Sequence, residues 1–189
     1  MFLNQLSIAK RLACVLGLIL SLSLLTSLFA VFKLRQMGEV TDAMLAVNLT
    51  GVFLTLREGL LQMTGWGRLI SVASTAGLKG YAKVAPYAAA KHGVIGMCRS
   101  LALEVARKPI TVNAICPGFL DTPMTDHSVQ VIAEKTGKTL AEARAALEGL
   151  NPQNRLFQPA EVTAAALFLC GAGSEGINGQ SITIAGGEV

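Results

Sequence analysis

The chain has a long uncharged segment near its N-terminus. Residues 12–32 read LACVLGLILSLSLLTSLFAVF, with basic side chains at both ends of the run. At about 1.5 Å per residue, a helix of this length crosses a hydrocarbon layer of ~30 Å. The segment therefore predicts a membrane-inserting helix. A signal peptide cleaved after Ala30 is the alternative, although Leu28 stands where such a cleavage site needs a small residue.

Beyond Gly38 the pattern changes to short apolar runs that alternate with helical periodicity. Three β-branched runs that end in small or turn residues are predicted strands: 68–74, 110–116 and 181–187. Three stretches with helical spacing of apolar residues are predicted helices: 41–63, 84–107 and 160–170. This alternation indicates an α/β fold, in which right-handed crossovers build a parallel sheet with helices on both faces.

A fourth helical stretch, 129–148, lies in the long connection between the second and third strands. Its polar composition is typical of a mobile, exposed lid more than of core. The sequence therefore predicts two parts. Residues 1–40 form an anchor-like helix, and residues 41–189 form the α/β domain.

Composition and charge exclude two classes of protein. The chain is 52% hydrophobic and 15% charged, so it is not a disordered chain. Of its net charge of +4, +3 lies in residues 1–40 and only +1 in the remainder. A protein that binds nucleic acid through a basic face would not have an almost neutral main body.

The cysteines and histidines are too few and too scattered for a zinc-type cluster, so no metal site is expected. No C-x-x-C spacing occurs, and the four cysteines are expected to be reduced core residues: Cys14, Cys98, Cys116 and Cys170. His92 follows Lys91 directly and is expected to point away from it in a structural role. Asp121 and Glu104 lack a partner for a carboxylate pair and are expected to be surface or capping groups.

Three residues form a candidate catalytic set. Tyr87 and Lys91 stand four residues apart on a predicted helix, which puts them on one face, one turn apart. A lysine ammonium favours the tyrosinate and so lowers a phenol pKa that is otherwise about 10. Ser74 ends the first predicted strand, where its hydroxyl can bond a substrate oxygen. Together they offer a proton donor, its activator and a stabiliser of a developing oxyanion.

These residues resemble those of the short-chain dehydrogenase/reductase family, over about residues 42–187. The run LAVNLTGVF (45–53) is similar to the helix whose asparagine completes the family's catalytic tetrad. The resemblance implies that Asn48 holds a proton-relay water, that Ser74 orients the substrate and that Tyr87 is the acid/base. It also implies NAD or NADP as cofactor, with Tyr87 and Lys91 at the nicotinamide ribose.

A second segment, ITVNAICPGFLDTPM (110–124), resembles the family's strand and turn beneath the nicotinamide. The resemblance implies that Pro117 and Gly118 shape this turn. It implies that Leu120 offers its backbone, and Thr122 its hydroxyl, to the carboxamide and phosphate. Residues 154–187 look like the family's closing helix and strand.

The Gly-rich turn that opens the family's fold has no counterpart before Asn48 in this sequence. A literal G-x-G-x-x-G occurs at 171–176, but it leaves a predicted helix and enters a strand, so it is not expected to hold a pyrophosphate. The expected fold is an incomplete Rossmann-like parallel sheet of about three strands with flanking helices. The N-terminal apolar helix, which resembles a chemoreceptor anchor, is added to it.

The resemblance implies an NAD(P)-dependent oxidoreductase that interconverts a ketone, 3-oxoacyl or similar, and a secondary alcohol. The alternative is a catalytically silent truncated or fused remnant, tethered to the membrane and unable to bind the dinucleotide; a membrane-sensor fragment is a third hypothesis. A small-molecule substrate is expected, and a homo-oligomer formed through the helices of Asn48 and Tyr87. An active domain is expected on the cytoplasmic side of the membrane, or, alternatively, in the cytoplasm.

Overall fold

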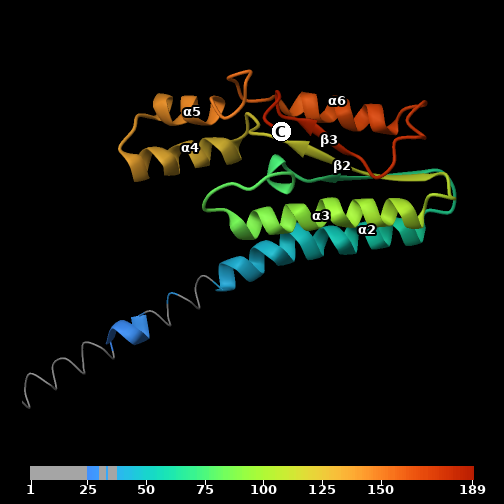
Figure 1. Ribbon diagram of the computed structural model, residues 1–189, viewed down its shortest axis with the longest axis horizontal. Helices are drawn as coiled ribbons and strands as arrows, with labels where there is room; N and C mark the ends of the chain where they lie inside the picture. Colours follow the sequence, from blue (N-terminus) through green and yellow to red (C-terminus); the bar gives the residue numbers. More distant parts are fainter. Residues whose placement is uncertain (1–24, 30–32, 34–37) are drawn as a thin grey trace, which may run out of the picture. The chain divides into compact units, whose positions relative to one another are not determined.

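The computed structural model describes residues 25–29, 33 and 38–189 (Figure 1). The chain divides into two compact units, Met1–Ala43 and Met44–Val189. Most of the predicted membrane segment 12–32 lies outside the described residues; within it, residues 25–29 are helical.

One helix in the described part of the chain, Gly38–Gln62, is long and apolar enough to cross a membrane by length and composition. A window of 18 residues within it has a mean hydropathy of 1.3. From Leu49 onward, however, this helix belongs to the packing of the second unit. Leu56 is buried there, and Leu49, Val52 and Leu60 pack against the same core.

The second unit is built on a parallel sheet. In the described residues the sheet has three strands, β1 (Gly67–Val72), β2 (Ile110–Pro117) and β3 (Ser181–Ile184), in the order β1-β2-β3. Val72 pairs with Ile115, and Pro117 pairs with Ile184, so the three strands end at one common edge. The predicted α/β fold with a parallel sheet is confirmed, although β1 and β3 end earlier than predicted. The chain leaves β1 where Ser74 caps a short helical turn, and it leaves β3 before the positive-φ pair at Gly186.

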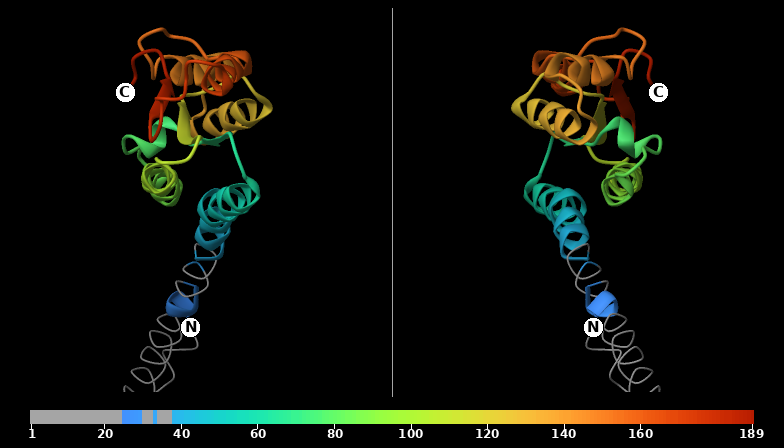
Figure 2. Two further views of the ribbon diagram at one scale, coloured as in Figure 1. Left: turned by 90° about the vertical axis from the view of Figure 1, so that its right-hand side faces the viewer. Right: turned by 90° about the vertical axis from the view of Figure 1, so that its left-hand side faces the viewer.

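Helices cover the two faces of this sheet (Figures 1 and 2). Helices α2 (Gly51–Gln62) and α3 (Ala85–Glu104) lie on one face, and α6 (Pro159–Cys170) lies on the other. All eight residues of β2 are buried, because this central strand has a neighbour on both sides and helices above and below. The main core joins the inner face of α3 to alternate positions of the sheet: Val94, Ile95, Cys98, Ala102, Leu69, Val112 and Ala114.

The region predicted as one helix over 129–148 forms two. Helix α4 (Pro123–Thr136) ends at Gly137, which has φ 72° in the left-handed region that favours glycine. Helix α5 (Leu140–Glu148) begins with a capping box, in which the Thr139 hydroxyl and the Glu142 carboxylate each bond the other's backbone N–H. The single-helix prediction was wrong because it read apolar spacing across these stop and start signals.

This helix pair has a small core of its own, formed by Val129, Ala143, Leu147 and Leu156. Its role as a lid stays a prediction.

The cysteines follow their expected burial only in part: Cys98 and Cys116 are buried, whereas Cys170 is exposed at the end of α6. Cys14 lies outside the described residues.

Candidate active site

Helix α3 carries Tyr87 and Lys91 on one face. The Lys91 side chain is buried, and its Nζ donates a hydrogen bond to the carbonyl oxygen of Val72, 3.1 Å away at the end of β1. The same Nζ lies 5.6 Å from the centre of the Tyr87 ring. Burial lowers the pKa of Lys91, with a smaller opposing effect from Cys116. The arrangement fixes a cation beside a half-buried phenol.

Ser74 caps a short turn that packs closely against this helix. It is the N-cap of the short 3-10 turn η3 (Thr75–Gly77), and its Oγ accepts a hydrogen bond of 3.1 Å from the Ala76 N–H. A Cβ at Gly77 would lie 2.7 Å from both the Lys91 carbonyl oxygen and the Ile95 side chain. Only glycine therefore lets η3 press against α3. Sequence reasoning missed Gly77, for which the small residues after Ser74 were the available signal.

Asn48 lies in the π-helical turn η2 (Ala46–Thr50), which continues directly into α2. Its Nδ2 donates to the Met44 carbonyl, 3.2 Å away, so its side chain is bonded to its own helix. The η2 turn packs against α3, with the Leu49 side chain resting on Gly93. The structure thus places the Asn48 segment against α3, the helix of Tyr87 and Lys91, and the role of Asn48 stays a prediction. Single π-turns within α-helices occur frequently at functional sites.

The turn after β2 is tightly packed. The Gly118 N–H donates to the Ile184 carbonyl at 3.0 Å, and a Cβ at Gly118 would lie 3.2 Å from Glu188 Oε2 and 3.4 Å from the Phe157 ring. Leu120 forms a parallel bridge with Phe157. The backbone between Pro117 and Leu120 is therefore held on both sides.

Thr122 stands at the N-terminus of α4, followed by Pro123 in the first turn. Its side chain forms no capping hydrogen bond with the helix. The N–H groups of a helix N-terminus attract anions, and here a hydroxyl stands beside them. This arrangement is compatible with a phosphate oxygen as a ligand of Thr122.

A thiol that sequence reasoning placed only in the core lies under the catalytic candidates. Cys116 is fully buried on β2 and is hydrogen-bonded to the backbone of Ser74. Burial raises the pKa of Cys116, so it stays a neutral thiol near the Lys91 ammonium.

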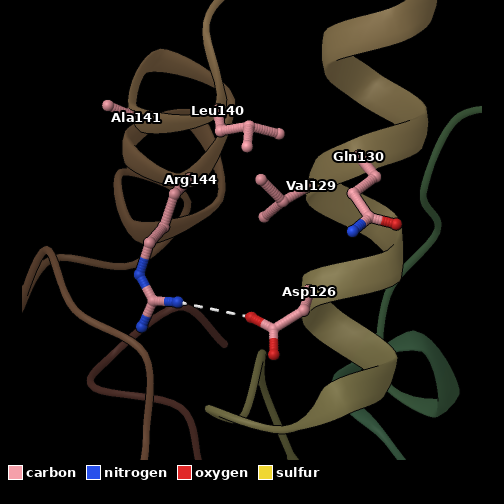
Figure 3. Close-up of a pocket in the computed structure, with 6 residues that line it drawn as sticks. All are labelled: Asp126, Val129, Gln130, Leu140, Ala141 and Arg144. Atoms are coloured by element: carbon pink, nitrogen blue, oxygen red, sulfur yellow. Dashed lines mark ion pairs between the residues drawn. The ribbon is translucent and has the colours of Figure 1, made fainter.

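A second cluster joins α4 and α5. Arg144 forms ion pairs with Asp121 at 2.7 Å and Glu148 at 3.1 Å. A third ion pair, with Asp126 at 3.6 Å, is drawn in Figure 3. The hydrogen bond from Arg144 lowers the pKa of Asp121. Asp121 thus joins the turn after β2 to α5, and its side chain is partly exposed, as expected for a surface or capping group.

A cavity of about 250 Å³ lies beside this cluster, lined by Asp126, Val129, Gln130, Leu140, Ala141 and Arg144 (Figure 3). None of the catalytic candidates lines it.

His92 is exposed on α3 and is hydrogen-bonded to the Ala88 carbonyl, in agreement with its expected structural role.

Comparison with known proteins defines the class. Residues 32–188 match the family model described as enoyl-(acyl carrier protein) reductase. The chain therefore belongs to the short-chain dehydrogenase/reductase family, as its motifs predict.

Two curated relatives illustrate the match. A putative ketoacyl reductase of Streptomyces coelicolor is 39% identical over 144 residues, which cover 74% of this chain and 55% of the relative. A D-beta-hydroxybutyrate dehydrogenase of Cupriavidus necator is 38% identical over 154 residues, which cover 80% of this chain and 60% of the relative. The chain thus spans 55% to 60% of the length of these relatives.

Solved structures agree with the fold. A variant of actinorhodin polyketide ketoreductase solved with NADPH has a TM-score of 0.69 and 38% identity, covering 74% of this chain and 55% of that one. Levodione reductase has a TM-score of 0.71 and 34% identity, covering 77% of this chain and 56% of that one.

Proposed function

We propose that this chain is an NAD(P)-dependent oxidoreductase that interconverts a ketone and a secondary alcohol, with a 3-oxoacyl compound or similar ketone as substrate. The observation that carries the proposal is the anchored pair on α3. Lys91 is buried and bonded to the end of β1, 5.6 Å from the Tyr87 ring, and η3 brings Ser74 to the same helix. The family relatives named as ketoacyl reductase and hydroxybutyrate dehydrogenase support this substrate class.

The residues present fit the nicotinamide half of the cofactor. The turn at Gly118 is held in place, because its N–H donates to the Ile184 carbonyl and its Cβ position lies against Glu188 and Phe157. Thr122 offers a hydroxyl without a capping role at a helix N-terminus. We assign the nicotinamide side to Pro117, Gly118, Leu120 and Thr122, and the ribose to Tyr87 and Lys91. In the described residues the G-x-G-x-x-G sequence at 171–176 follows α6 and precedes β3, so it does not fit the pyrophosphate.

Bound nicotinamide supplies a hydride donor or acceptor. The chain's residues handle the proton. The Tyr87 hydroxyl gives its proton to the carbonyl oxygen during reduction, and the Ser74 hydroxyl donates a hydrogen bond to the same oxygen. The Lys91 ammonium stabilises the phenolate that remains, and Asn48 holds the water that restores the proton.

The test is reduction of a panel of 3-oxoacyl thioesters and small ketones by the purified chain, followed by the absorbance of the nicotinamide. Tyr87→Phe removes the proton donor and is expected to lower kcat by about 10²- to 10⁴-fold. His92→Gln is the matched control, because it changes an exposed side chain on the same helix and is expected to leave kcat unchanged. No absorbance change with the whole panel would contradict the proposal.

The second candidate function is a catalytically silent chain that acts by associating with complete relatives. It is favoured by the place of the G-x-G-x-x-G sequence at 171–176, which follows α6 and precedes β3 and so does not fit a pyrophosphate. Helices α2 and α3 would form the contact, and exposed apolar side chains on α2, among them Phe53 and Leu61, support that assignment. Saturable binding of NADH or NADPH by the purified chain would exclude the silent alternative.

Attachment to a membrane is a separate part of the proposal. We assign it to residues 12–32, with the enzyme-like part on the cytoplasmic side, where the nicotinamide pool is. The uncharged run between basic residues supports this assignment. A reporter fused after Val189 tests it, and a periplasmic signal would contradict it.

A further inference from the structure

Glu188 has a buried carboxylate with two partners on Oε1. Its side chain is 2% exposed. Its carboxylate accepts a hydrogen bond from the Tyr81 hydroxyl and lies 3.1 Å from Lys79 Nζ. The same ammonium donates to the Glu188 backbone carbonyl at 3.1 Å. A buried carboxylate is costly unless it is paired and hydrogen-bonded, and here Oε1 has both an ammonium and a hydroxyl as partners.

The second carboxylate oxygen faces the turn after β2. Glu188 Oε2 lies 3.2 Å from the position that a Cβ of Gly118 would take. Glu188 itself follows β3, and its N–H donates to the Ala185 carbonyl at 3.0 Å. The carboxylate therefore lies at the carboxyl edge of the sheet, in contact with the segments that follow all three strands.

Tyr81 extends this contact to the turn that Ser74 caps. The Tyr81 oxygen is also 2.8 Å from Thr75 Oγ1. A phenol has one proton, which goes to the carboxylate, so the Thr75 hydroxyl donates to the phenol oxygen. Thr75 is 3% exposed, and its carbonyl accepts the N–H groups of Leu78 and Lys79 at 2.9 Å and 3.0 Å.

We propose that Glu188 is a positioning residue: by holding Lys79 and Tyr81, it fixes the η3 turn and thereby the position of the Ser74 hydroxyl, which caps that turn. The part that concerns Ser74 rests on the proposed oxidoreductase function. The part that concerns the η3 turn is independent of activity. We call the group formed by Glu188, Lys79, Tyr81 and Thr75 the edge cluster.

The chemistry gives each member a distinct role. Tyr81 keeps its proton, because burial and the neighbouring Glu188 carboxylate raise its pKa to about 12. It therefore acts as a neutral hydrogen-bonding link. Without the phenol oxygen, the Thr75 hydroxyl loses its partner in a buried position, which favours opening of the turn.

The first experiment measures amide hydrogen exchange in the full chain. Tyr81→Phe and Glu188→Ala are expected to speed exchange of the Ala76, Gly77 and Leu78 amides by about 10-fold or more, since these amides bond within the η3 turn. The amides of β2 are expected to keep their rates, which shows that the fold is intact. Unchanged rates in the turn would overturn the proposal.

The second experiment separates kcat from KM in the same variants. A misplaced hydroxyl is expected to lower kcat about 10-fold or more, because a shift of ~1 Å can cost about 10²-fold. Binding of NADH or NADPH is expected to stay unchanged in Tyr81→Phe, because this variant leaves Lys91 and the contact between Glu188 and the Gly118 turn in place. Glu188→Gln keeps an acceptor for Tyr81 and is expected to fall between Glu188→Ala and the natural chain.

Glu175→Gln is the matched control, because it removes a carboxylate that faces Arg68 near the opposite end of β1. It is expected to change neither exchange in the η3 turn nor kcat. If the variants loosen the turn while kcat of an active chain is unaffected, the positioning role is overturned. If the natural chain shows no turnover, the proposed function fails, and the exchange rates alone decide whether the edge cluster holds the turn.

Discussion

The two tyrosines of the chain occupy different chemical environments. Tyr87 stands beside a buried ammonium, whereas Tyr81 donates to a buried carboxylate. Their positions in the sequence, six residues apart, give no hint of this difference. Burial and the adjacent Glu188 carboxylate favour the neutral phenol of Tyr81. The two side chains can therefore have opposite roles within one loop and helix.

Titration of phenolate absorbance tests the environment of Tyr81. We expect one ionisation near pH 12, which Tyr81→Phe removes and which Glu188→Gln moves to lower pH. The raised pKa of Tyr81 also makes the stability of the fold depend on pH. The protonated phenol stabilises the folded state below about pH 10, and this contribution is lost as the pH rises towards 12. A high-pH ionisation that survives in Tyr81→Phe would contradict the assignment.

Glu161 gives a prediction at low pH. Arg155 donates to its carboxylate, and the Gln158 N–H does so as well, which lowers the pKa of Glu161 from 4.5 to about 2. A lowered carboxyl pKa stabilises the fold above the unfolded value and loses that contribution as the pH falls through the folded value. Thermal unfolding between about pH 4.5 and 2 is therefore expected to depend less on pH in Glu161→Gln.

Arg155→Met removes the partner and is expected to reduce the same dependence. If thermal unfolding of both variants depends on pH in the same way as that of the natural chain at acid pH, the Arg155–Glu161 pair does not contribute to the acid stability of the fold.

Local spacing was enough to predict part of the site. Tyr87 and Lys91 are one helical turn apart, so their common face follows from the sequence. Glu188 is more than a hundred residues from Tyr81, and no local pattern signals their contact. Gly77 is similar, because the atoms that exclude a Cβ there belong to α3. Residues whose roles depend on distant segments were therefore the ones that sequence reasoning missed.

At the scale of elements, α3 organises the site, because η2, η3 and β1 all meet it. The sequence predicted this helix closely, since Pro86 marks its start and its apolar spacing is continuous. The α4 and α5 pair was predicted less well. There the interruption depends on a left-handed Gly137 and a capping box, which are short signals inside a long helical pattern.

Gly77→Ala tests the contact between η3 and α3. The added methyl group would meet backbone atoms of Lys91, so we expect the free energy of unfolding to fall by about 1–3 kcal/mol. Gly96→Ala on α3 is the matched control, because nothing lies within 4 Å of its Cβ position. It is expected to stabilise the helix, by at most about 1 kcal/mol. Chemical denaturation of both variants measures the difference.

An equal effect of the two glycine substitutions would contradict the close approach. So would an unchanged stability in Gly77→Ala.

At the scale of the whole molecule, the three strands of the described sheet are shielded from solvent to different degrees. Strand β2 is buried along its full length, whereas Val72 on β1 is exposed and β3 is only half-buried. We expect the amides of Val112–Cys116 to exchange slowest, with those of β1 and β3 faster. Hydrogen exchange followed by peptide mass spectrometry measures this order. Equal protection of all three strands would contradict it.

The fold class could be predicted because parallel strands and crossover helices leave a periodic signal along the chain. The three strands, their order along the chain and the helix that carries Tyr87 all followed from it. The order of strands in space came from the structure, because apolar runs do not specify neighbours. Strand ends were also less accurate, since they depend on individual turn residues such as Ser74 and Gly186.

The reactivity of the described cysteines can report transient opening of the fold around β2. Cys170 is exposed, whereas Cys98 and Cys116 are buried and have raised pKa values. A thiol reagent therefore meets Cys170 in the native state but reaches Cys116 only after the layer above β2 separates. Because Cys116 interacts with the Ser74 backbone, its labelling rate would measure how often the carboxyl edge of the sheet opens, without any introduced probe.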